Sequence, residues 1–350
     1  MTPRGTDWSL ALLVAAGAAT GLATWFAGSP GASWVFAAHA VGGGCLALVL
    51  VFKLRRVLPR LRERARRDPE VVGGLAALGF VAVVLASGLA WSTAGRLDLG
   101  GYSVLVWHGA LGGALAVLVL LHALLRAKRP RRRDVADRRQ FLTAAAVGAG
   151  ALAAWRLQRP LERALGLPGG ARRFTGSYDA GSFTGNDFPT TSWVADHPRP
   201  RMGGLAVTGR VRRELSLPAE ALDRGDELVA TLDCTGGFET TQRWRGVRLG
   251  RLLEEAGVRP GARHVRVISR TGYRWSFSLA DARGLLLATR VGGEPLSHGH
   301  GAPCRLVAPG RRGFQWVKWV ERGEVHEDPD PGALASTVLS SFSAEGRGAA

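Results

Sequence analysis

The chain has 350 residues, 46% of them hydrophobic, and a formal net charge of +18, so its length allows two or three domains. A charge of this size would suit a nucleic-acid partner, but much of it lies in two short blocks between long apolar segments, at residues 53–67 and 126–139. Such blocks are typical of the cytoplasmic loops of membrane proteins. We therefore predict no nucleic-acid partner, and we expect these blocks to contact anionic membrane lipids. Three cysteines are too few for a disulfide framework.

Four apolar segments come first in the chain, at residues 8–27, 33–52, 71–91 and 102–125. Each is close to the ~20 residues that a helix needs to cross a bilayer. The connection between the first two carries no charge, and the connection between the third and fourth carries only Arg96 and Asp98. By the positive-inside rule these connections lie outside and the N-terminus lies inside. We predict an all-α transmembrane bundle over residues 1–128, in a multi-pass protein of the cell membrane.

A fifth, weaker apolar segment, residues 141–155, follows Asp137-Arg138-Arg139-Gln140-Phe141-Leu142. Paired arginines before Phe-Leu and a mildly apolar stretch resemble a twin-arginine export signal, which implies export of a folded, cofactor-loaded domain. A plain fifth transmembrane helix with a basic flank is the alternative. Both interpretations place the chain beyond Arg156 outside. We expect a basic loop with this fifth segment (129–158), a linker (159–182) and an extracytoplasmic domain (183–350).

Two histidines lie inside the apolar segments, His39 in the second and His108 in the fourth, each about six residues from the outer end. The helical rise places both rings roughly 9 Å deep on the same side of the membrane. Polar residues this deep in a membrane usually have a function. Two imidazoles on different helices can ligate the iron of a haem b from both faces. Structural hydrogen bonding by the two rings is the alternative.

The residues that follow the two histidines are similar, since Gly42-Gly43 comes after His39 and Gly112-Gly113 comes after His108. These glycines would leave room for a flat macrocycle, or would let the helices pack closely. The similarity also predicts that the first two helices are repeated as the third and fourth. His122 lies fourteen residues beyond His108, roughly 21 Å deeper. It cannot bind the same iron, and we place it at the membrane interface or near a quinone.

The second half of the chain changes to short strands and turns with few helices. Strands are expected near residues 205–209, 228–232, 264–268 and 304–308, and short helices near 249–256 and 279–287. Short β-branched and apolar runs bounded by glycine and proline are the signal for these strands. We predict a mainly β, α+β domain after the transmembrane helices.

Cys234 follows a strand-like run and precedes Thr235-Gly236-Gly237, a turn-forming sequence. A thiol on such a turn is presented to its surroundings, which favours a role as a metal ligand. A buried cysteine that acts as a small hydrophobe is the alternative. Cys304 falls inside an apolar strand, and we interpret it as a core residue.

A series of motifs accompanies Cys234 in the chain: Gly185-Asn186-Asp187-Phe188-Pro189, Trp244-Arg245-Gly246-Val247-Arg248-Leu249, Gly272-Tyr273, Gly293-Glu294-Pro295-Leu296, His300-Gly301-Ala302-Pro303-Cys304-Arg305 and Val317-Lys318-Trp319-Val320. Their order and spacing resemble the sulfite oxidase-type molybdopterin-binding domain. Members of that family include sulfite oxidases, plant-type nitrate reductases and the periplasmic methionine sulfoxide reductase catalytic subunit. The resemblance covers about the last half of the chain.

The resemblance implies a molybdenum–molybdopterin cofactor with Cys234 as the thiolate ligand, and soft sulfur ligands suit such a metal. It also implies that four polar residues grip the pterin and its phosphate, namely Asn186, His300, Arg305 and Lys318. Arg311 and Arg312 would add to the positive electrostatic potential at the cofactor site, or they would be solvated charges on the surface. Tyr273 matches a tyrosine that lines the metal site in sulfite oxidases, where it would take part in catalysis. Packing in the core is the alternative for Tyr273.

Gly185 stands where sulfite oxidases have an arginine that helps bind the anionic substrate. This departure places sulfite in doubt and favours an S-oxide, such as oxidised methionine, as the small-molecule substrate. The sequence thus predicts a membrane-anchored molybdenum-dependent oxidoreductase that performs two-electron or oxygen-atom-transfer chemistry outside the membrane. A haem b between His39 and His108 would exchange electrons with quinone or another redox partner. Two alternatives stay open: a cytochrome b-type membrane protein with a redox-inactive outer module, and a haem-free anchored enzyme similar to sulfite oxidase.

Overall fold

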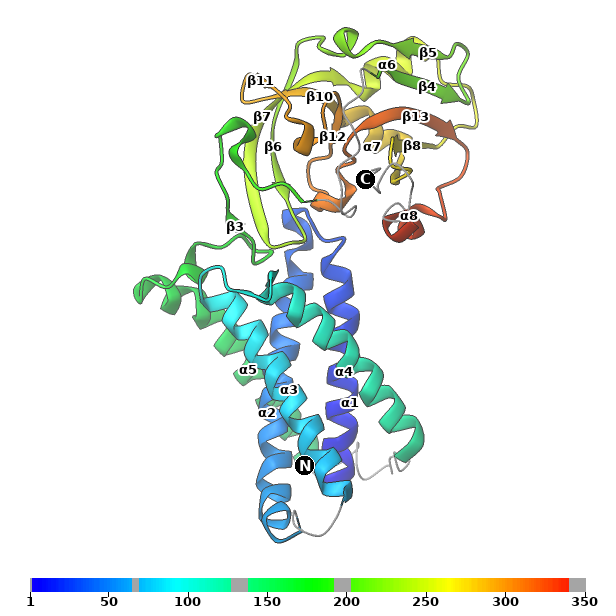
Figure 1. Ribbon diagram of the computed structural model, residues 1–350. Coiled ribbons are helices and arrows are strands. Elements are labelled where there is room, and N and C mark those ends of the chain that lie inside the picture. The colour runs from blue at the N-terminus through cyan, green and yellow to red at the C-terminus, as the bar shows by residue number, and fades with distance from the viewer. Residues whose placement is uncertain (1, 65–68, 127–137, 192–202, 340–350) are drawn as a thin grey trace. The chain divides into compact units, whose positions relative to one another are not determined.

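The computed structural model describes residues 2–64, 69–126, 138–191 and 203–339. The chain divides into two compact units, Met1–Tyr178 and Asp179–Ala350. The first is helical, and the second is built from two sheets and short helices (Figure 1). The predicted fold class, a helical bundle followed by a mainly β, α+β domain, is confirmed.

The long helices of the first unit are α1 (Pro3–Thr24), α2 (Ser33–Arg64), α3 (Pro69–Thr93), α4 (Val104–Arg126) and α5 (Arg138–Ala164). A short hairpin, β1 (Asp98–Leu99) and β2 (Tyr102–Ser103), joins α3 to α4. Among the described residues, three stretches are long and apolar enough to cross a membrane, namely Pro3–Thr24, Pro30–Pro59 and Val104–Leu124. The apolar stretch of α3, Ala77–Thr93, is shorter. Length and hydropathy therefore support three of the four predicted crossings.

The first four helices pack around a small apolar core. Helix α1 lies against both α2 and α4, and α3 lies against α4. Each of these helices contributes one buried residue to the core, which consists of Val14, Leu46, Val84 and Leu115. Inside a membrane, close van der Waals packing of this kind holds helices together, because the lipid is as apolar as the side chains.

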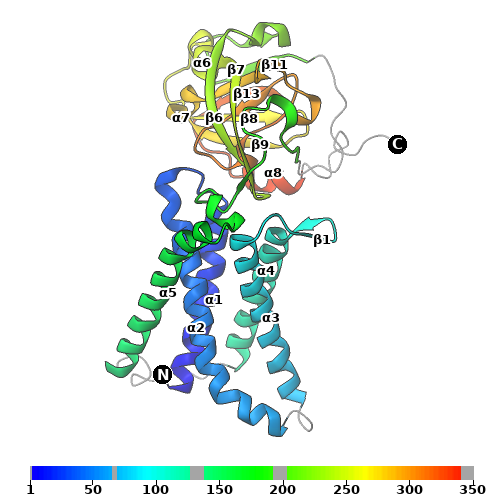
Figure 2. The ribbon, with the colours of Figure 1, turned by 90° about the vertical axis from the view of Figure 1, so that its left-hand side faces the viewer.

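Helix α5 packs against α2 (Figure 2). A Cβ added at Gly44 of α2 would lie 3.1 Å from the Cβ of Ala151, so the approach of the two helices depends on glycine at this position. The helix begins at Arg138, the first of the paired arginines, and continues to Ala164. The segment predicted as an export signal thus forms part of one continuous helix within the bundle.

The chain beyond α5 is fastened to the end of α3. The guanidinium of Arg172 stacks 4.3 Å from the ring centroid of Trp91. The same group donates a hydrogen bond of 2.9 Å to the carbonyl of Ala94. Carbonyls at the end of a helix have no partner within it, so Arg172 both satisfies this group and adds a cation–π contact. These contacts fix the middle of the segment that the sequence predicts as a linker (159–182), whose first residues belong to α5.

The second unit contains two sheets. In the first, β7 (Phe238–Arg248) pairs with β6 (Asp226–Asp233) and β10 (Leu286–Val291), and β10 also pairs with β11 (Glu294–Pro295) and β12 (Arg305–Val307). The second sheet has the order β5 (Leu215–Leu217), β4 (Leu205–Gly209), β13 (Val320–His326), β8 (His264–Ser269) and β9 (Arg274–Ser278). A two-residue strand, β3 (Tyr178–Asp179), spans the boundary of the units, and three short helices complete the fold: α6 (Leu249–Ala256), α7 (Leu279–Gly284) and α8 (Ala333–Leu339).

One predicted helix is only partly correct. The helix expected at residues 279–287 ends at Gly284, and the next residues form β10. Leu286 and Leu287 are almost completely buried between β7 and β12, with which they pair. A short apolar run that is buried on both faces of a sheet has no alternation, so its period does not distinguish strand from helix.

Candidate functional site

Cys234 lies at the tip of the hairpin formed by β6 and β7. The backbone N–H of Cys234 donates to the carbonyl of Phe238 at 2.8 Å, and its own carbonyl accepts from Gly237 N–H at 3.0 Å. Gly237 has a φ of +98°, a left-handed conformation that glycine adopts without strain. The turn thus closes tightly, and the sequence prediction that a glycine-rich turn carries this thiol is correct in its local geometry.

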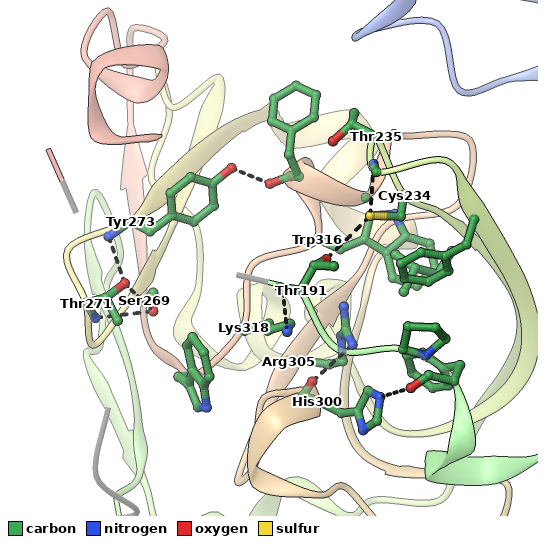
Figure 3. Close-up of a pocket in the computed structure, with 18 residues that line it drawn as sticks. Thr191, Cys234, Thr235, Ser269, Thr271, Tyr273, His300, Arg305, Trp316 and Lys318 are labelled. Atoms are coloured by element: carbon green, nitrogen blue, oxygen red, sulfur yellow. Dashed lines mark hydrogen bonds between the residues drawn. The ribbon is translucent and has the colours of Figure 1, made fainter. Parts of the chain in front are cut away.

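The thiol of Cys234 lines a cavity of the second unit (Figure 3). Its Sγ accepts a hydrogen bond of 3.3 Å from the backbone N–H of Gly236 and lies 3.5 Å from the hydroxyl of Thr191. Cys304, in contrast, is fully buried, and burial raises the pKa of its thiol to about 12. The two cysteines are not joined by a disulfide.

A buried ion pair supports the tip of the hairpin. Arg312 Nη1 lies 2.5 Å from Asp233 Oδ1, and the two side chains are only 5% and 2% exposed. Arg312 Nη2 also donates to the carbonyl of Cys234 at 3.3 Å. A Cβ added at Gly313 would lie 3.0 Å from the Cα of Cys234, so the loop that carries Arg312 packs directly on the turn. Arg312 is therefore a structural support for Cys234, and it is not a solvated surface charge.

The substitution Asp233→Asn is expected to lower the free energy of unfolding by about 3 kcal/mol, because the charge of Arg312 would remain buried without its partner. Chemical unfolding of the full chain, followed by tryptophan fluorescence, measures the loss. Asp281→Asn is the matched control, because it breaks the Arg311–Asp281 pair, whose side chains are 40% and 51% exposed. An exposed pair contributes less than about 1 kcal/mol. Equal losses in the two variants would contradict the supporting role of the buried pair.

Two cations line the cavity near Cys234. Arg305 is 1% exposed and donates from Nη1 to the carbonyl of His300 at 3.0 Å. Its guanidinium lies 5.2 Å from the ring centroid of Trp244. The ammonium of Lys318 donates to two carbonyls, those of Thr191 and Gly299, each at 2.7 Å. Among the described residues that line the cavity there is no aspartate or glutamate, and neither cation forms an ion pair with a described carboxylate.

The electrostatics of the two cations favour an anion in the cavity. Burial, followed by the positive charge of Arg305, lowers the pKa of Lys318 to about 7, and Cys234 opposes the shift. Burial also lowers the pKa of Arg305 to about 10. A buried cation loses its hydration, and an anion placed beside it would restore the lost stabilisation. The Nε of Arg305 is buried without a hydrogen-bond partner among the described residues, so its N–H can donate a hydrogen bond to such an anion.

Sulfate is expected to bind the cofactor-free protein more tightly at about pH 6 than at about pH 8, with an affinity that falls about tenfold per pH unit above the pKa of Lys318. The affinity falls with rising pH because the pKa of Lys318 is lowered to about 7 in the folded protein. Its ammonium therefore loses its proton as the pH rises through that value. Sulfate keeps its charge over this range, and calorimetric titration measures its affinity. Lys318→Gln should abolish the pH dependence, and a flat profile in the unchanged protein would count against the anion site.

His300 lines the cavity, but both of its ring nitrogens already have partners in the protein. Nδ1 lies 2.7 Å from the hydroxyl of Ser297, and Nε2 lies 2.9 Å from the carbonyl of Phe188. The ring packs on Phe188 with 4.0 Å between centroids. Since the carbonyl of His300 holds Arg305, the structure gives this histidine a supporting position.

Asn186 and Tyr273 take positions that the sequence could not specify. Asn186 is not among the residues that line the cavity. Its side chain accepts from Ser297 N–H at 2.9 Å and donates to the carbonyl of Pro295 at 3.0 Å, which fastens its turn to the chain after β11. Tyr273 lines the cavity, and its hydroxyl donates to the carbonyl of Phe314 (Figure 3). Burial raises the pKa of this hydroxyl well above its usual value.

Two further residues line the cavity without having been singled out from the sequence. Thr191 contacts both Cys234 and Lys318. Trp319 has a φ of +50°, a conformation that a bulky residue rarely adopts, and its indole N–H donates to the carbonyl of His298 at 2.9 Å. Strained backbone of this kind concentrates at functional sites. No signal in the sequence marks the strain, although Trp319 lies within one of the quoted motifs.

In the first unit, the structure brings His39 of α2 and His108 of α4 together. Their ring centroids are 5.9 Å apart, and the ring planes are inclined by 85°. A Cβ added at the four glycines that follow the two histidines (Gly42, Gly43, Gly112 and Gly113) would meet no atom within 4 Å. A side chain at these positions would therefore not obstruct helix–helix contact in the described part of the bundle. His122, also on α4, is exposed.

The second unit thus combines an α+β scaffold with a cavity that a cysteine and two cations line. Residues 196–334 match the family described as oxidoreductase molybdopterin binding domain. The second unit is accordingly a sulfite oxidase-type molybdopterin-binding domain.

Similar proteins span several activities. The chain is 31% identical over 165 residues to the protein-methionine-sulfoxide reductase catalytic subunit MsrP of Gluconobacter oxydans, covering 40% of this chain and 52% of that one. It is 32% identical over 154 residues to a nitrate reductase of Hordeum vulgare, covering 34% of this chain and 17% of that one. It is 30% identical over 179 residues to the mitochondrial sulfite oxidase of Rattus norvegicus, covering 42% of this chain and 32% of that one.

A solved structure, the sulfane dehydrogenase SoxCD from Paracoccus pantotrophus, is also similar to the chain. The identity is 29%, the match covers 36% of this chain and 39% of that one, and the TM-score is 0.35. The chain spans about half the length of the Gluconobacter oxydans relative and less of the others. The comparisons therefore concern part of a protein, and the family match lies within the second unit, at residues 196–334.

Proposed function

We propose that the chain is a membrane-anchored, molybdopterin-dependent oxidoreductase whose second unit lies outside the cell membrane. One observation supports this most strongly: the thiol of Cys234 faces a cavity whose described lining contains two cations and no carboxylate. An anionic, thiolate-accepting cofactor satisfies all three groups together. When bound, such a cofactor supplies two-electron and oxygen-atom-transfer chemistry that protein side chains cannot provide.

The residues around the cavity would divide the work of holding this cofactor. Cys234 would supply the metal ligand, held toward the cavity by the tight hairpin turn. Arg305 and Lys318 would bind the phosphate of the pterin, because both point a charged group into the cavity without an ion-pair partner among the described residues. His300 would fix Arg305 through its carbonyl, and Asn186 would order the turn that leads to Phe188. The aromatic residues of the lining would exclude water from the reacting atoms.

We infer that the first unit carries a haem b between His39 and His108. Metal–imidazole bonds of about 2 Å on two opposite rings place the ring centroids about 6 Å apart. The observed 5.9 Å fits this requirement, and a Cβ at any of the four glycines that follow the histidines would meet no described atom within 4 Å. A haem here would pass electrons between quinone, or another redox partner, and the cofactor of the second unit.

The substrate that the site favours is an S-oxide, such as oxidised methionine. Gly185 has a φ of +66°, and a Cβ at this position would lie 3.5 Å from the carboxylate of Glu294. The left-handed backbone disfavours any residue with a side chain, so the cation that sulfite oxidases place here is replaced by an uncharged turn. The loss of that positive charge favours a neutral substrate over sulfite.

Metal analysis of the purified full chain, together with a reduced-minus-oxidised absorption spectrum, tests the proposal. We expect molybdenum and a b-type haem band in the same preparation, and turnover of methionine sulfoxide in preference to sulfite. A haem band without molybdenum would indicate an electron-transfer cytochrome with a redox-inactive module. Molybdenum without the band would indicate an enzyme that is only anchored by its helices.

A further inference from the structure

The hydroxyl of Thr20 on α1 determines which nitrogen of His39 carries a proton. Thr20 Oγ1 donates to the carbonyl of Ala16 at 2.7 Å and lies 3.0 Å from His39 Nδ1. A hydroxyl has one proton to donate. With its proton on the carbonyl, the hydroxyl accepts a hydrogen bond from the ring, and the His39 ring also has a backbone hydrogen-bond partner at Gly17. Nδ1 of His39 therefore carries the proton, and Nε2 keeps its lone pair.

The second pair of helices repeats this arrangement. Ser87 Oγ on α3 donates to the carbonyl of Val84 at 2.9 Å and lies 3.2 Å from His108 Nδ1. The same Nδ1 lies 3.0 Å from the carbonyl of Val84 itself. A carbonyl can only accept, so Nδ1 of His108 must also be the protonated nitrogen. The lone pair of His108 Nε2 is likewise left for a metal.

A glycine follows each hydroxyl residue and lets the ring approach. A Cβ at Gly21 would lie 3.3 Å from Cε1 of His39, and a Cβ at Gly88 would lie 2.9 Å from Cε1 of His108. The motif hydroxyl–glycine on one helix and histidine on the next thus occurs twice, in α1–α2 and in α3–α4. The contacts around the two histidine rings are thus repeated between the two helix pairs, as the sequence predicts.

We propose that Thr20 and Ser87 are positioning residues that hold both histidines as the Nδ1–H tautomer and thereby tune the haem. This inference rests on the proposed haem. The two sides are alike, because each ring has a hydroxyl partner and a backbone partner: Thr20 and Gly17 for His39, Ser87 and Val84 for His108. Loss of either hydroxyl should therefore disturb its ring to a similar extent.

The substitution Thr20→Val removes the hydroxyl and keeps the shape of the side chain. An acceptor on the ring N–H makes an imidazole a stronger ligand for oxidised iron. Without it, the midpoint potential of the haem should rise and haem affinity should fall by about tenfold. Thr20→Ser restores a hydroxyl and should return both values toward those of the unchanged protein. Ser87→Ala should produce the same changes to a similar extent, because a backbone carbonyl remains beside each ring.

Redox titration of the haem band in the three variants measures these shifts. An unchanged potential in both Thr20→Val and Ser87→Ala would overturn the inference while leaving the haem itself in place. Absence of a haem band from the unchanged protein would refute the haem instead. The tautomers can then be tested in the haem-free chain by ¹⁵N NMR of the ring nitrogens, with His39→Gln to assign one signal set. Protonated Nε2 on His39 would refute the inference independently of haem.

Discussion

The substitution Cys234→Ser is expected to remove molybdenum from the purified protein and to reduce its turnover by more than about 100-fold, since even residues that only orient metal ligands cost 10–100-fold when lost. The hydroxyl of serine is a hard, weakly acidic donor, and it does not replace a thiolate as a ligand for a soft site. Molybdenum content per chain, measured by mass spectrometry, and turnover of methionine sulfoxide with an artificial electron donor report the two effects.

The variant should stay folded, because the turn at Cys234 is held by backbone hydrogen bonds and by the Arg312–Asp233 pair, not by the sulfur. Cys304→Ala is the matched control. Cys304 is fully buried in the same unit, but it does not line the cavity. We expect this control to keep its molybdenum and its activity. If Cys234→Ser retained both full metal content and full turnover, the thiol would not be the ligand.

The sequence predicted the presentation of Cys234 because the signal is local. A strand followed by Thr235-Gly236-Gly237 specifies a turn, and the tight hairpin is its direct consequence. The partners of the turn are not local. Arg312 reaches Asp233 across 79 residues of sequence, and no periodicity or turn rule connects two positions so far apart. The sequence therefore gives Arg312 the same interpretation as its neighbour Arg311, although the Arg312 side chain is only 5% exposed and the Arg311 side chain is 40% exposed.

The sequence also does not specify the direction in which a side chain points. The motifs placed His300, Tyr273 and Asn186 near the cavity or its borders, yet none of them reveals which atom faces which partner. In the structure the ring of His300 is engaged on both nitrogens, and the hydroxyl of Tyr273 turns to Phe314. Their assignment to the cofactor stays a prediction. Rotamers depend on the packing of neighbouring elements, which a motif does not contain.

His39 and His108 differ from these residues, because the sequence does predict that they lie near each other although they are distant in the chain. A helix has a fixed rise of about 1.5 Å per residue, so equal distances from the outer ends place His39 and His108 at equal depth. The bilayer supplies the common reference that a soluble fold lacks. Equal depth does not establish that the rings face each other, and the structure adds this with a centroid separation of 5.9 Å.

The substitution His39→Ala is expected to reduce the b-type haem band to less than about a tenth of its original amplitude, because one of two axial ligands is lost. His122→Ala is the matched control. His122 lies on the same helix as His108 but is exposed, and it has no described contact with the pair. It should therefore leave the band unchanged. An equal loss in both variants would point to general damage to the bundle.

The His39→Ala chain should keep its molybdenum, because Cys234, Arg305 and Lys318 all belong to the other unit. It should also keep its helical fold, because the four buried core residues of the bundle do not include either histidine. Turnover with a soluble artificial donor should then persist, while turnover with quinol should fall together with the haem band. This separation follows only if electrons pass from quinone through the haem. Quinol-dependent turnover without the band would contradict that route and leave the helices of the first unit as an anchor alone.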